Sequence, residues 1–318
     1  MRRMLKTIGC MLGAVAVLSC CSAARAEKCI GGVELRVSSP DTPEAMQGML
    51  LLVEVRSERP MAQIGAKWNE REVPFWKEPV SDKDKSADIA DVRRALLGID
   101  LEKPAGKYPF VVETQLADGQ RLSCSETMVV EEGHFATESL TVKQQFVEPN
   151  PEQLARAEEE QKRLRAIYDT VTPERLWTGA FRMPLDGDFK GSNFGKRRVL
   201  NGKSGSPHGG TDFPAPAGTP VHASQAGRVV LAEELYFSGN TVIVDHGLGI
   251  YTFYCHFSEI DAKAGEMVEA GTVLGKVGAT GRVTGPHLHW ALEVEHARVN
   301  ALDIVKLLGS GPEKVATR

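Results

Sequence analysis

The sequence has little excess charge, few cysteines and, beyond its first 26 residues, no long hydrophobic run. Its formal net charge is −4 at pH 7, so the basic footprint that favours nucleic-acid binding is missing and we expect no nucleic-acid partner. No later stretch approaches the ~20 apolar residues of a transmembrane helix. With 42% hydrophobic and 25% charged residues the composition is that of a globular protein, and 318 residues suggest two domains.

Residues 1–26 have the pattern of a secretory signal peptide. A basic start over residues 2–6 precedes an apolar run over 8–18, and Ala24-Arg25-Ala26 has small residues where signal peptidase reads them. We therefore expect export to the periplasm or cell envelope, or secretion. In an alternative interpretation, Val17-Leu18-Ser19-Cys20 is an imperfect lipoprotein cleavage site, and the protein contacts a membrane only if it is lipidated at Cys20.

Three of the six cysteines lie in this leader, and Cys29, Cys124 and Cys255 remain. In an oxidising compartment an odd number suggests one disulfide and one free thiol. We expect Cys29 to pair with Cys124 because both lie in the same N-terminal region. The alternative is three buried, reduced cysteines.

Residues 27–147 have the pattern of a small antiparallel β-sandwich. The run over 48–55 is apolar and β-branched, alternate residues from Tyr108 to Leu116 form one face, and Asp118-Gly119 is a hairpin signal. We also expect a helical turn or two over 89–97. The region has no cluster of metal ligands or nucleophiles, so we expect a targeting or regulatory role.

Residues 148–175 are expected to form a helical linker. Asn150 followed by Pro151 is typical of an N-cap and a first helical position, and 151–170 contains few helix breakers. Its narrow apolar stripe indicates a helix laid against one domain. We expect this helix and the N-terminal region to cover part of a neighbouring groove.

Residues 176–309 are expected to form a compact, mainly antiparallel β-domain, followed by a flexible tail over 310–318. The region is rich in Gly and Pro, has short β-type runs, and shows almost no helical periodicity before 301–308. Seven of the eight histidines fall here. This concentration directs the search for a functional site to this domain.

Three short motifs in this domain offer metal ligands. His208-Gly-Gly-Thr-Asp212 holds an imidazole and a carboxylate, and its glycine pair can curve the backbone so that they converge. His287-Leu-His289 places two imidazoles on one face of a strand, and His256 adds another in an apolar strand, where an unpaired polar group is costly. A catalytic zinc ion takes three N or O ligands and keeps one open position, so imidazoles with one carboxylate fit it. The helical H-E-x-x-H arrangement of other zinc peptidases does not occur.

Together these motifs resemble those of the lysostaphin/LytM-type zinc metallopeptidases. The resemblance covers about Phe181 to Ile304 and is carried in order by His208–Asp212, Gly239–Gly247, Tyr254–Phe257, Gly278–Gly281 and Gly285–Trp290. It implies a lysostaphin/LytM-like antiparallel β-sheet catalytic domain that holds one zinc ion. By position, it implies that the zinc ligands are His208, Asp212 and His289, and that His256 and His287 are the paired catalytic histidines.

The same resemblance guides the remaining assignments. No glutamate occupies the usual general-base position, so we assign water deprotonation and orientation, or oxyanion stabilisation, to His256 and His287 without dividing these roles. Cys255 adjoins His256, but adjacent strand residues face opposite sides, so we expect no nucleophilic role for it. Several members of the family carry a tyrosine shortly before the first ligand, whereas 202–207 has none. Either the histidines act alone or a substitute comes from Tyr236, Tyr251 or Tyr254.

Two residues are assigned to substrate binding. Arg282, between Gly281 and Val283, is expected to line the groove and meet an acidic stem peptide, the alternative being a solvent-exposed side chain. Asn240, in the Gly239–Gly247 motif, is also assigned to substrate binding. No motif reads a particular residue at the scissile bond or indicates an oligomeric state.

The sequence therefore predicts an exported zinc endopeptidase that hydrolyses cross-links or stem peptides of bacterial peptidoglycan through a metal-activated water. One alternative is a non-catalytic cell-wall-binding regulator of another hydrolase, although such members usually lack ligands and this chain has all of them. Another is a peptidase that acts on exported proteins with the same site.

Overall fold

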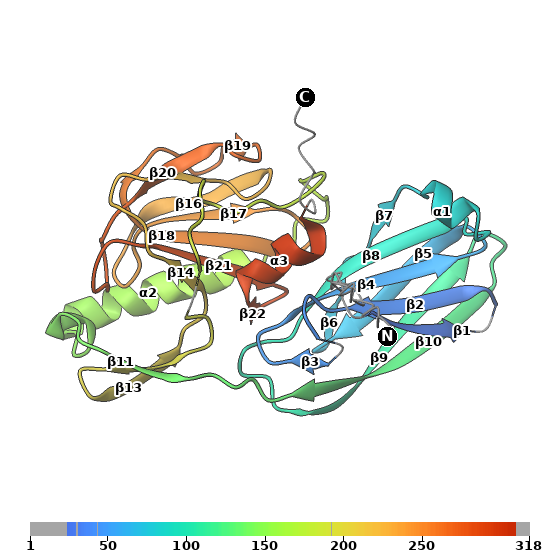
Figure 1. Ribbon diagram of the computed structural model, residues 1–318, viewed down its shortest axis with the longest axis horizontal. Helices are drawn as coiled ribbons and strands as arrows, with labels where there is room; N and C mark the ends of the chain where they lie inside the picture. The colour runs from blue at the N-terminus through green and yellow to red at the C-terminus, as the bar shows by residue number, and fades with distance from the viewer. Residues whose placement is uncertain (1–23, 30, 43, 192, 310–318) are drawn as a thin grey trace, which may run out of the picture.

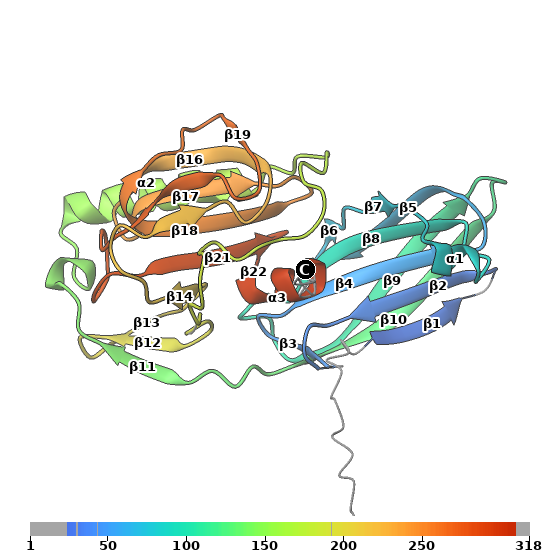
Figure 2. The ribbon, with the colours of Figure 1, turned by 45° about the horizontal axis from the view of Figure 1, so that its top comes forward.

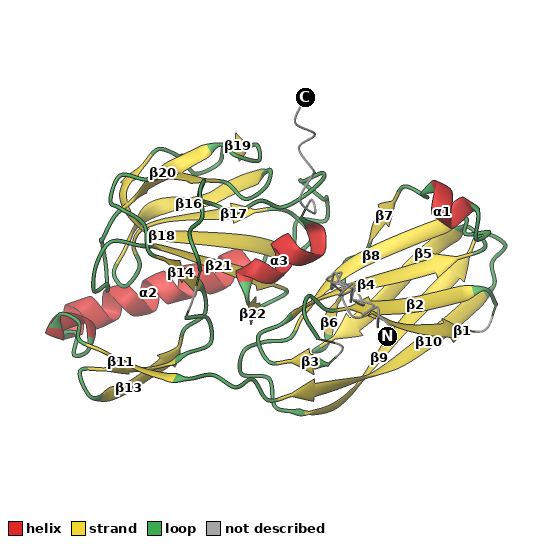
Figure 3. Ribbon diagram, in the orientation of Figure 1, coloured by secondary structure: helices red, strands yellow, loops and turns green. Residues whose placement is uncertain are grey.

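The computed structural model describes residues 24–309 except 30, 43 and 192. Two lobes, both built mainly from strands, lie side by side, with the short helix α3 (Ala301–Leu308) between them (Figure 1, Figure 2 and Figure 3). Residues 1–23 of the expected leader, with the expected lipidation site Cys20, and the expected tail 310–318 lie outside the described residues. In the described part of the chain, no helix has the length and hydrophobicity to cross a membrane.

The N-terminal lobe is a sandwich of two five-stranded sheets, as predicted. Its sheets have the orders β1-β2-β4-β8-β7 and β3-β10-β9-β5-β6, and β3 pairs with β10 in parallel. The predicted alternation is confirmed, because Phe110, Val112, Thr114 and Leu116 are buried. The strands are β1 (Ala24–Cys29), β2 (Val33–Ser38), β3 (Ala45–Met46), β4 (Leu50–Ser57), β5 (Met61–Trp68), β6 (Arg71–Glu72), β7 (Trp76–Glu78), β8 (Asp91–Gly98), β9 (Gly106–Leu116) and β10 (Arg121–Glu131).

The helical turns predicted over 89–97 are wrong. Residues 91–98 form β8, which pairs with β4 along its whole length. Both faces of this strand are buried, since Ala95 and Leu97 lie in the sandwich core while Leu96 packs into the core of the other lobe. A strand buried on both faces loses its alternation, so its apolar spacing can resemble that of a helix. The helical turn of this lobe is instead α1 (Asp82–Lys85).

The two cysteines expected to pair lie on different sheets. Cys29 is on β1 and Cys124 is on β10, their Cα atoms are 5.6 Å apart, and the structure joins them as a disulfide between the sheets. Cys255 is buried and free.

The chain crosses to the second lobe through a short strand and a helix. β11 (Thr137–Leu140) adds a parallel strand to the hairpin of β12 (Arg197–Leu200) and β13 (Lys203–Pro207), and the 3-10 turn η1 (Gln144–Phe146) follows it. The predicted helix is α2 (Pro151–Tyr168), which begins with a reciprocal capping box between Asn150 and Gln153. Its C-terminal half packs against Tyr251 and Phe253.

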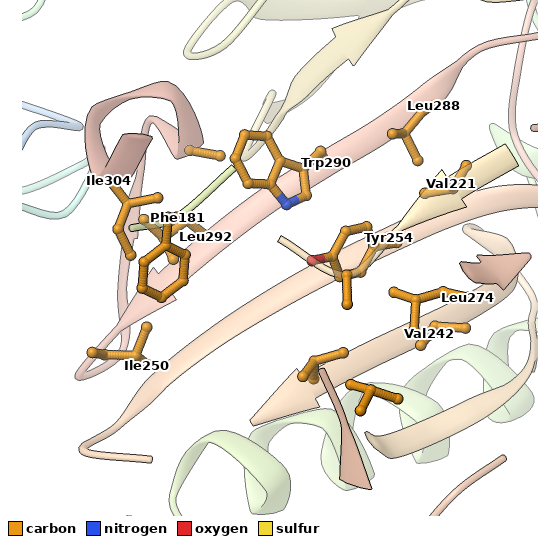
Figure 4. Packing of buried hydrophobic residues seen from close by; sticks show 14 of the residues in the cluster. Phe181, Val221, Val242, Ile250, Tyr254, Leu274, Leu288, Trp290, Leu292 and Ile304 are labelled. Atoms are coloured by element: carbon orange, nitrogen blue, oxygen red, sulfur yellow. The ribbon is translucent and has the colours of Figure 1, made fainter. Parts of the chain in front are cut away.

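The C-terminal lobe is built on a nine-stranded, antiparallel sheet whose central order is β14-β21-β18-β17-β16-β19. β18 pairs with β21 as far as Cys255 and with β20 from Phe257 onward, so His256 lies where its partners diverge. Trp290, Tyr254 and other apolar side chains fill the inner face of the sheet (Figure 4). The strands are β14 (Thr211–Phe213), β15 (Pro220–His222), β16 (Gly227–Leu235), β17 (Gly239–Asp245), β18 (Ile250–Ile260), β19 (Met267–Val268), β20 (Val273–Val277), β21 (Leu288–Val294) and β22 (Ala297–Val299).

The two lobes share a continuous core. Trp76 of the sandwich packs edge-on against Trp177 at a ring-centroid distance of 5.3 Å, and it belongs to the hydrophobic cluster of the C-terminal lobe. At Gly98, a Cβ would lie 2.5 Å from that of Ala297, so glycine lets β8 approach the second lobe. Arg298 donates to Asp100 across the same interface. The sandwich is therefore packed against the second lobe rather than tethered to it.

Candidate metal centre and active site

Strand register places Asp212 and His289 side by side. Asp212 on β14 is paired with His289 on β21, which is paired with Cys255 on β18, and paired residues of an antiparallel sheet project from the same face. His208 reaches this face from the loop before β14. At Gly210, a Cβ would lie 2.5 Å from Nε2 of His289, so the loop can pass this closely only with glycine.

Three ligand atoms meet at this point: His208 Nε2, His289 Nδ1 and Asp212 Oδ1. Nε2 of His208 is 2.8 Å from Nδ1 of His289 and 3.1 Å from Oδ1 of Asp212, and the last two atoms are 2.9 Å apart. Nδ1 of His208 is 2.9 Å from the carbonyl oxygen of Asn193. Because a carbonyl only accepts, Nδ1 carries the hydrogen and Nε2 keeps its lone pair. A lone pair facing a carboxylate oxygen is repulsive unless a cation lies between them, so the group fits a divalent metal ion.

Burial of His289 and the imidazole contacts of Asp212 keep these two groups in the protonation states that a metal requires. Burial lowers the pKa of His289 to about 4, although the hydrogen bond with Asp212 acts in the opposite direction. Burial alone would raise the pKa of Asp212, but its close contacts with the imidazoles of His208 and His289 bring this pKa well below its usual value. At neutral pH the site therefore offers a neutral imidazole and an ionised carboxylate.

His256 reaches the site through a β-bulge. The neighbouring Tyr254 points into the core, and regular alternation would send His256 the same way (Figure 4). The register shifts here, because Asn240 pairs with Phe257 and Thr241 pairs with Cys255, which leaves His256 as the extra residue with φ +68°. The bulge turns its imidazole toward that of His287.

The predicted catalytic histidines lie together on a cavity of about 290 Å³ that Asp212 also lines. The ring centroids of His256 and His287 are 4.8 Å apart. Their Nδ1 atoms lie 2.8 Å from the carbonyl oxygen of Thr280 and 2.9 Å from that of Gly285, so each ring donates through Nδ1 and keeps a lone pair on Nε2. Burial lowers the pKa of His256 to about 3. At neutral pH the imidazole of His256 is therefore neutral, and it lies with that of His287 beside the metal-binding group.

Cys255 was expected to point away from the site because it alternates with His256, but the structure places it on the same face of the sheet as His289. A different property must therefore exclude it as a nucleophile. The thiol is fully buried, and burial, with the negative charge of Asp212, raises its pKa well above its ordinary value. A thiol that stays protonated and inaccessible is a poor nucleophile. Cys255 therefore contributes to packing.

The two residues assigned to substrate binding lie in different places. Arg282 lines the cavity, and its guanidinium carbon is 4.8 Å from the ring centroid of Phe237. Burial and the charge of Arg198 lower its pKa. Asn240 is not among the cavity-lining residues of the described chain; its side-chain amide donates to the carbonyl of Phe257 at 3.1 Å, behind the bulge. These contacts favour a supporting role for Asn240.

Arg198 is a site residue that the sequence motifs do not reveal. It lines the cavity from β12, and its Nη2 donates to Oδ2 of Asp212 at 3.0 Å. Its strand lies before the His208 motif and is placed by pairing with β11, which is distant in sequence. Glu138, Leu140 and Val142 of this connecting segment also border the cavity, whereas α2 contributes no residue to its wall.

None of the three candidate tyrosines lines the cavity in the described part of the chain. Their hydroxyl groups contact the carbonyl oxygens of residues 145 and 170 and the side chain of Ser224. Of the two possibilities left open by the sequence, the geometry favours histidines that act without a tyrosine.

Comparisons with known proteins agree with this arrangement. Residues 206–301 match the model of peptidase family M23. The crystal structure of a peptidase M23 homologue from Pseudomonas aeruginosa is 31% identical and has a TM-score of 0.61; the similarity covers 84% of this chain and 96% of that one. It therefore includes both lobes.

Curated relatives match a shorter part of the chain. The peptidoglycan DD-endopeptidase ShyA of Vibrio cholerae serotype O1 is 43% identical over 136 residues, which are 42% of this chain and 32% of the relative. The DD-carboxypeptidase/endopeptidase Mpg of Neisseria meningitidis serogroup B is 40% identical over 97 residues, which are 30% of this chain and 22% of the relative. The matched part of the chain thus spans a third or less of these relatives.

Proposed function

The chain belongs to peptidase family M23, and from this premise we propose that it is a zinc-dependent endopeptidase that hydrolyses peptide bonds of bacterial peptidoglycan. The observation that carries the proposal is the convergence of five side chains. His208, Asp212 and His289 form one donor group, and His256 and His287 lie beside it with Asp212 on one cavity.

We assign the metal to the donor group because its chemistry fits. Two imidazoles and one carboxylate are the ligands of a catalytic zinc site, and a donor group with one negative charge leaves a divalent ion with a net charge near +1. A zinc ion there supplies a Lewis acid that makes water more acidic and polarises the carbonyl of the scissile bond. His208, Asp212 and His289 would hold such an ion through Nε2, Oδ1 and Nδ1, the atoms that face one another in the donor group.

We assign the transfer of the water proton to His256 and His287. With Nδ1 fixed on a backbone carbonyl, each ring can orient a water molecule through Nε2 and accept its proton as the water oxygen attacks the carbonyl carbon. The protonated ring then stabilises the oxyanion and passes the proton to the amine that leaves. The cavity brings substrate and imidazoles together, which lowers the entropic cost of the reaction.

We propose that Arg282 binds a carboxylate of the stem peptide. Its guanidinium lines the cavity and is largely removed from water, and it forms no ion pair with the residues that the structure describes. Peptidoglycan as the substrate is supported by the names of the relatives, which describe peptidoglycan DD-endopeptidases. A substrate of this kind, together with the expected leader, supports a location in the cell envelope.

Mass spectrometry of the muropeptides released from defined sacculi tests the proposal and identifies the bond. The wild-type protein should release cleaved cross-links or stems, should lose this activity on chelation and regain it with zinc. His289→Ala should stay inactive at any zinc concentration. Activity that persists under chelation would reject the metal mechanism, and wall binding without metal or hydrolysis would favour a regulator. Cleavage of exported proteins but not of sacculi would favour the alternative function, a peptidase that acts on exported proteins.

A further inference from the structure

The two carboxylate oxygens of Asp212, a candidate metal ligand, have different partners, and Arg198 binds only one of them. Its Nη2 donates to Oδ2 of Asp212 at 3.0 Å, whereas Oδ1 faces His208 and His289 at 3.1 and 2.9 Å. Arg198 lies outside residues 206–301, which match the family. The family-model match therefore does not include it.

The surroundings of Arg198 indicate that this contact is specific. Its side chain is only 18% exposed, and Nε is buried without a hydrogen-bond partner in the described part of the chain. Burying a guanidinium is costly unless its charge is paired, so the ion pair with Asp212 accounts for its position. A side chain that only filled space would do so at lower cost without a charge.

The backbone of Arg198 is held by the segment that arrives from the N-terminal lobe. Arg198 on β12 is paired with Glu138 on β11. On either side of this pair, the amide of Arg197 donates to the carbonyl of Ala136 at 2.9 Å, and the amide of Asn201 donates to that of Leu140 at 3.0 Å. The guanidinium therefore approaches Asp212 from a fixed support.

We propose that Arg198 is a positioning residue that holds Oδ2 of Asp212 and so presents Oδ1 alone to the metal ion. The inference rests on the proposed function, since it requires that the donor group binds a metal. A carboxylate held by one oxygen leaves a coordination position open for water, and groups that orient a ligand in this way commonly strengthen metal binding 10–100-fold.

Zinc affinity of the metal-free mature protein, measured by competition with a chromophoric chelator, tests this role. Arg198→Met keeps the length of the side chain and removes its charge and donors, and it should bind zinc about 10–100-fold more weakly. Arg198→Lys keeps a cationic donor and should recover most of the affinity. Arg197→Met is the matched control, because Arg197 is the exposed neighbour on the same strand, and it should bind as the wild type does.

Cobalt gives a second readout. Wild-type protein with Co²⁺ should show the strong visible absorption of a four-coordinate ion, and Arg198→Met should show weaker bands as the carboxylate becomes free to bind through both oxygens. Thermal unfolding of each metal-free variant verifies its fold. If Arg198→Met does not fold, Arg198→Gln replaces it and should also bind zinc more weakly.

The outcomes separate this inference from the proposed function. Wild-type zinc affinity in a folded Arg198→Met or Arg198→Gln variant, with the wild type and Arg197→Met binding zinc, would overturn the role of Arg198 alone. If the wild type and Arg197→Met bind no zinc, both the proposed function and the role of Arg198 are refuted.

Discussion

The bulge at His256 allows catalysis to be separated from folding by a single substitution. His256→Asn removes the imidazole but keeps a residue that adopts positive φ more readily than most, so the backbone with φ +68° should persist. Loss of the hydrogen bond from Nδ1 to Thr280 should lower the free energy of unfolding by about 1 kcal/mol. Loss of a general acid–base group should lower kcat/KM by about 10²–10⁴-fold, which is a barrier increase of about 3–5 kcal/mol.

The assay follows muropeptide release from sacculi at saturating zinc, together with the zinc affinity of each variant. His222→Asn is the matched control, because Nδ1 of His222 also lies 2.9 Å from a backbone carbonyl, that of Gly271, but His222 does not line the cavity. The control should keep wild-type rates. Wild-type turnover in folded His256→Asn would refute the assigned role, and a loss of zinc affinity equal to the loss of activity would make His256 a ligand instead.

Three further predictions concern the lobe interface, the sandwich and the groove. Burial raises the pKa of Asp303 to about 7, and its carboxylate accepts from the amide of Leu50 across the interface. Because this folded-state pKa lies above the unfolded value of 3.8, the free energy of unfolding falls as pH rises from about 4 to 7. In urea unfolding between pH 5 and 8, the wild type should lose about 2–3 kcal/mol relative to Asp303→Asn. The same pH dependence of stability in both proteins would contradict this. The expected Cys29–Cys124 bond spans 95 residues, so replacing both cysteines by serine should cost about 4–5 kcal/mol in denaturant unfolding, and unchanged stability would mean that the bond does not form. Arg282→Met should raise KM about tenfold or more for stem peptides with free carboxylates and leave zinc affinity unchanged, whereas an equal effect on amidated peptides would exclude a carboxylate contact.

The individual motifs were visible in the sequence because each is local. The choice of His208, Asp212 and His289 as ligands came from the resemblance to the family, and Asp212 meets His289 only through the pairing of β14 with β21. The His208–Asp212 motif and the His287-x-His289 pair place their side chains through strand alternation and a glycine turn, which the sequence displays directly. The sandwich was predictable for the same reason, since β9 is buried on only one face. Where a strand is buried on both faces, as β8 is between the two lobes, the periodic signal disappears and a helix was predicted instead.

The rest of the site depends on contacts between segments far apart in the sequence. The orientation of His256 follows from a register shift between β17 and β18, which alternation within one strand does not show. Arg198 is placed by the parallel pairing of β12 with β11, which precedes α2 in the sequence. Asn240 lies within a family motif, yet its amide supports the bulge through Phe257 rather than the cavity wall. A motif therefore identified residues near the site but not the direction in which each one points.

The most direct test of the central claim is anomalous diffraction at the zinc absorption edge from crystals of the mature protein grown with zinc. A single ion should lie between Nε2 of His208, Nδ1 of His289 and Oδ1 of Asp212, with the imidazoles of His256 and His287 facing it. An ion bound by a different set of residues, or no ion in this group at saturating zinc, would contradict the account.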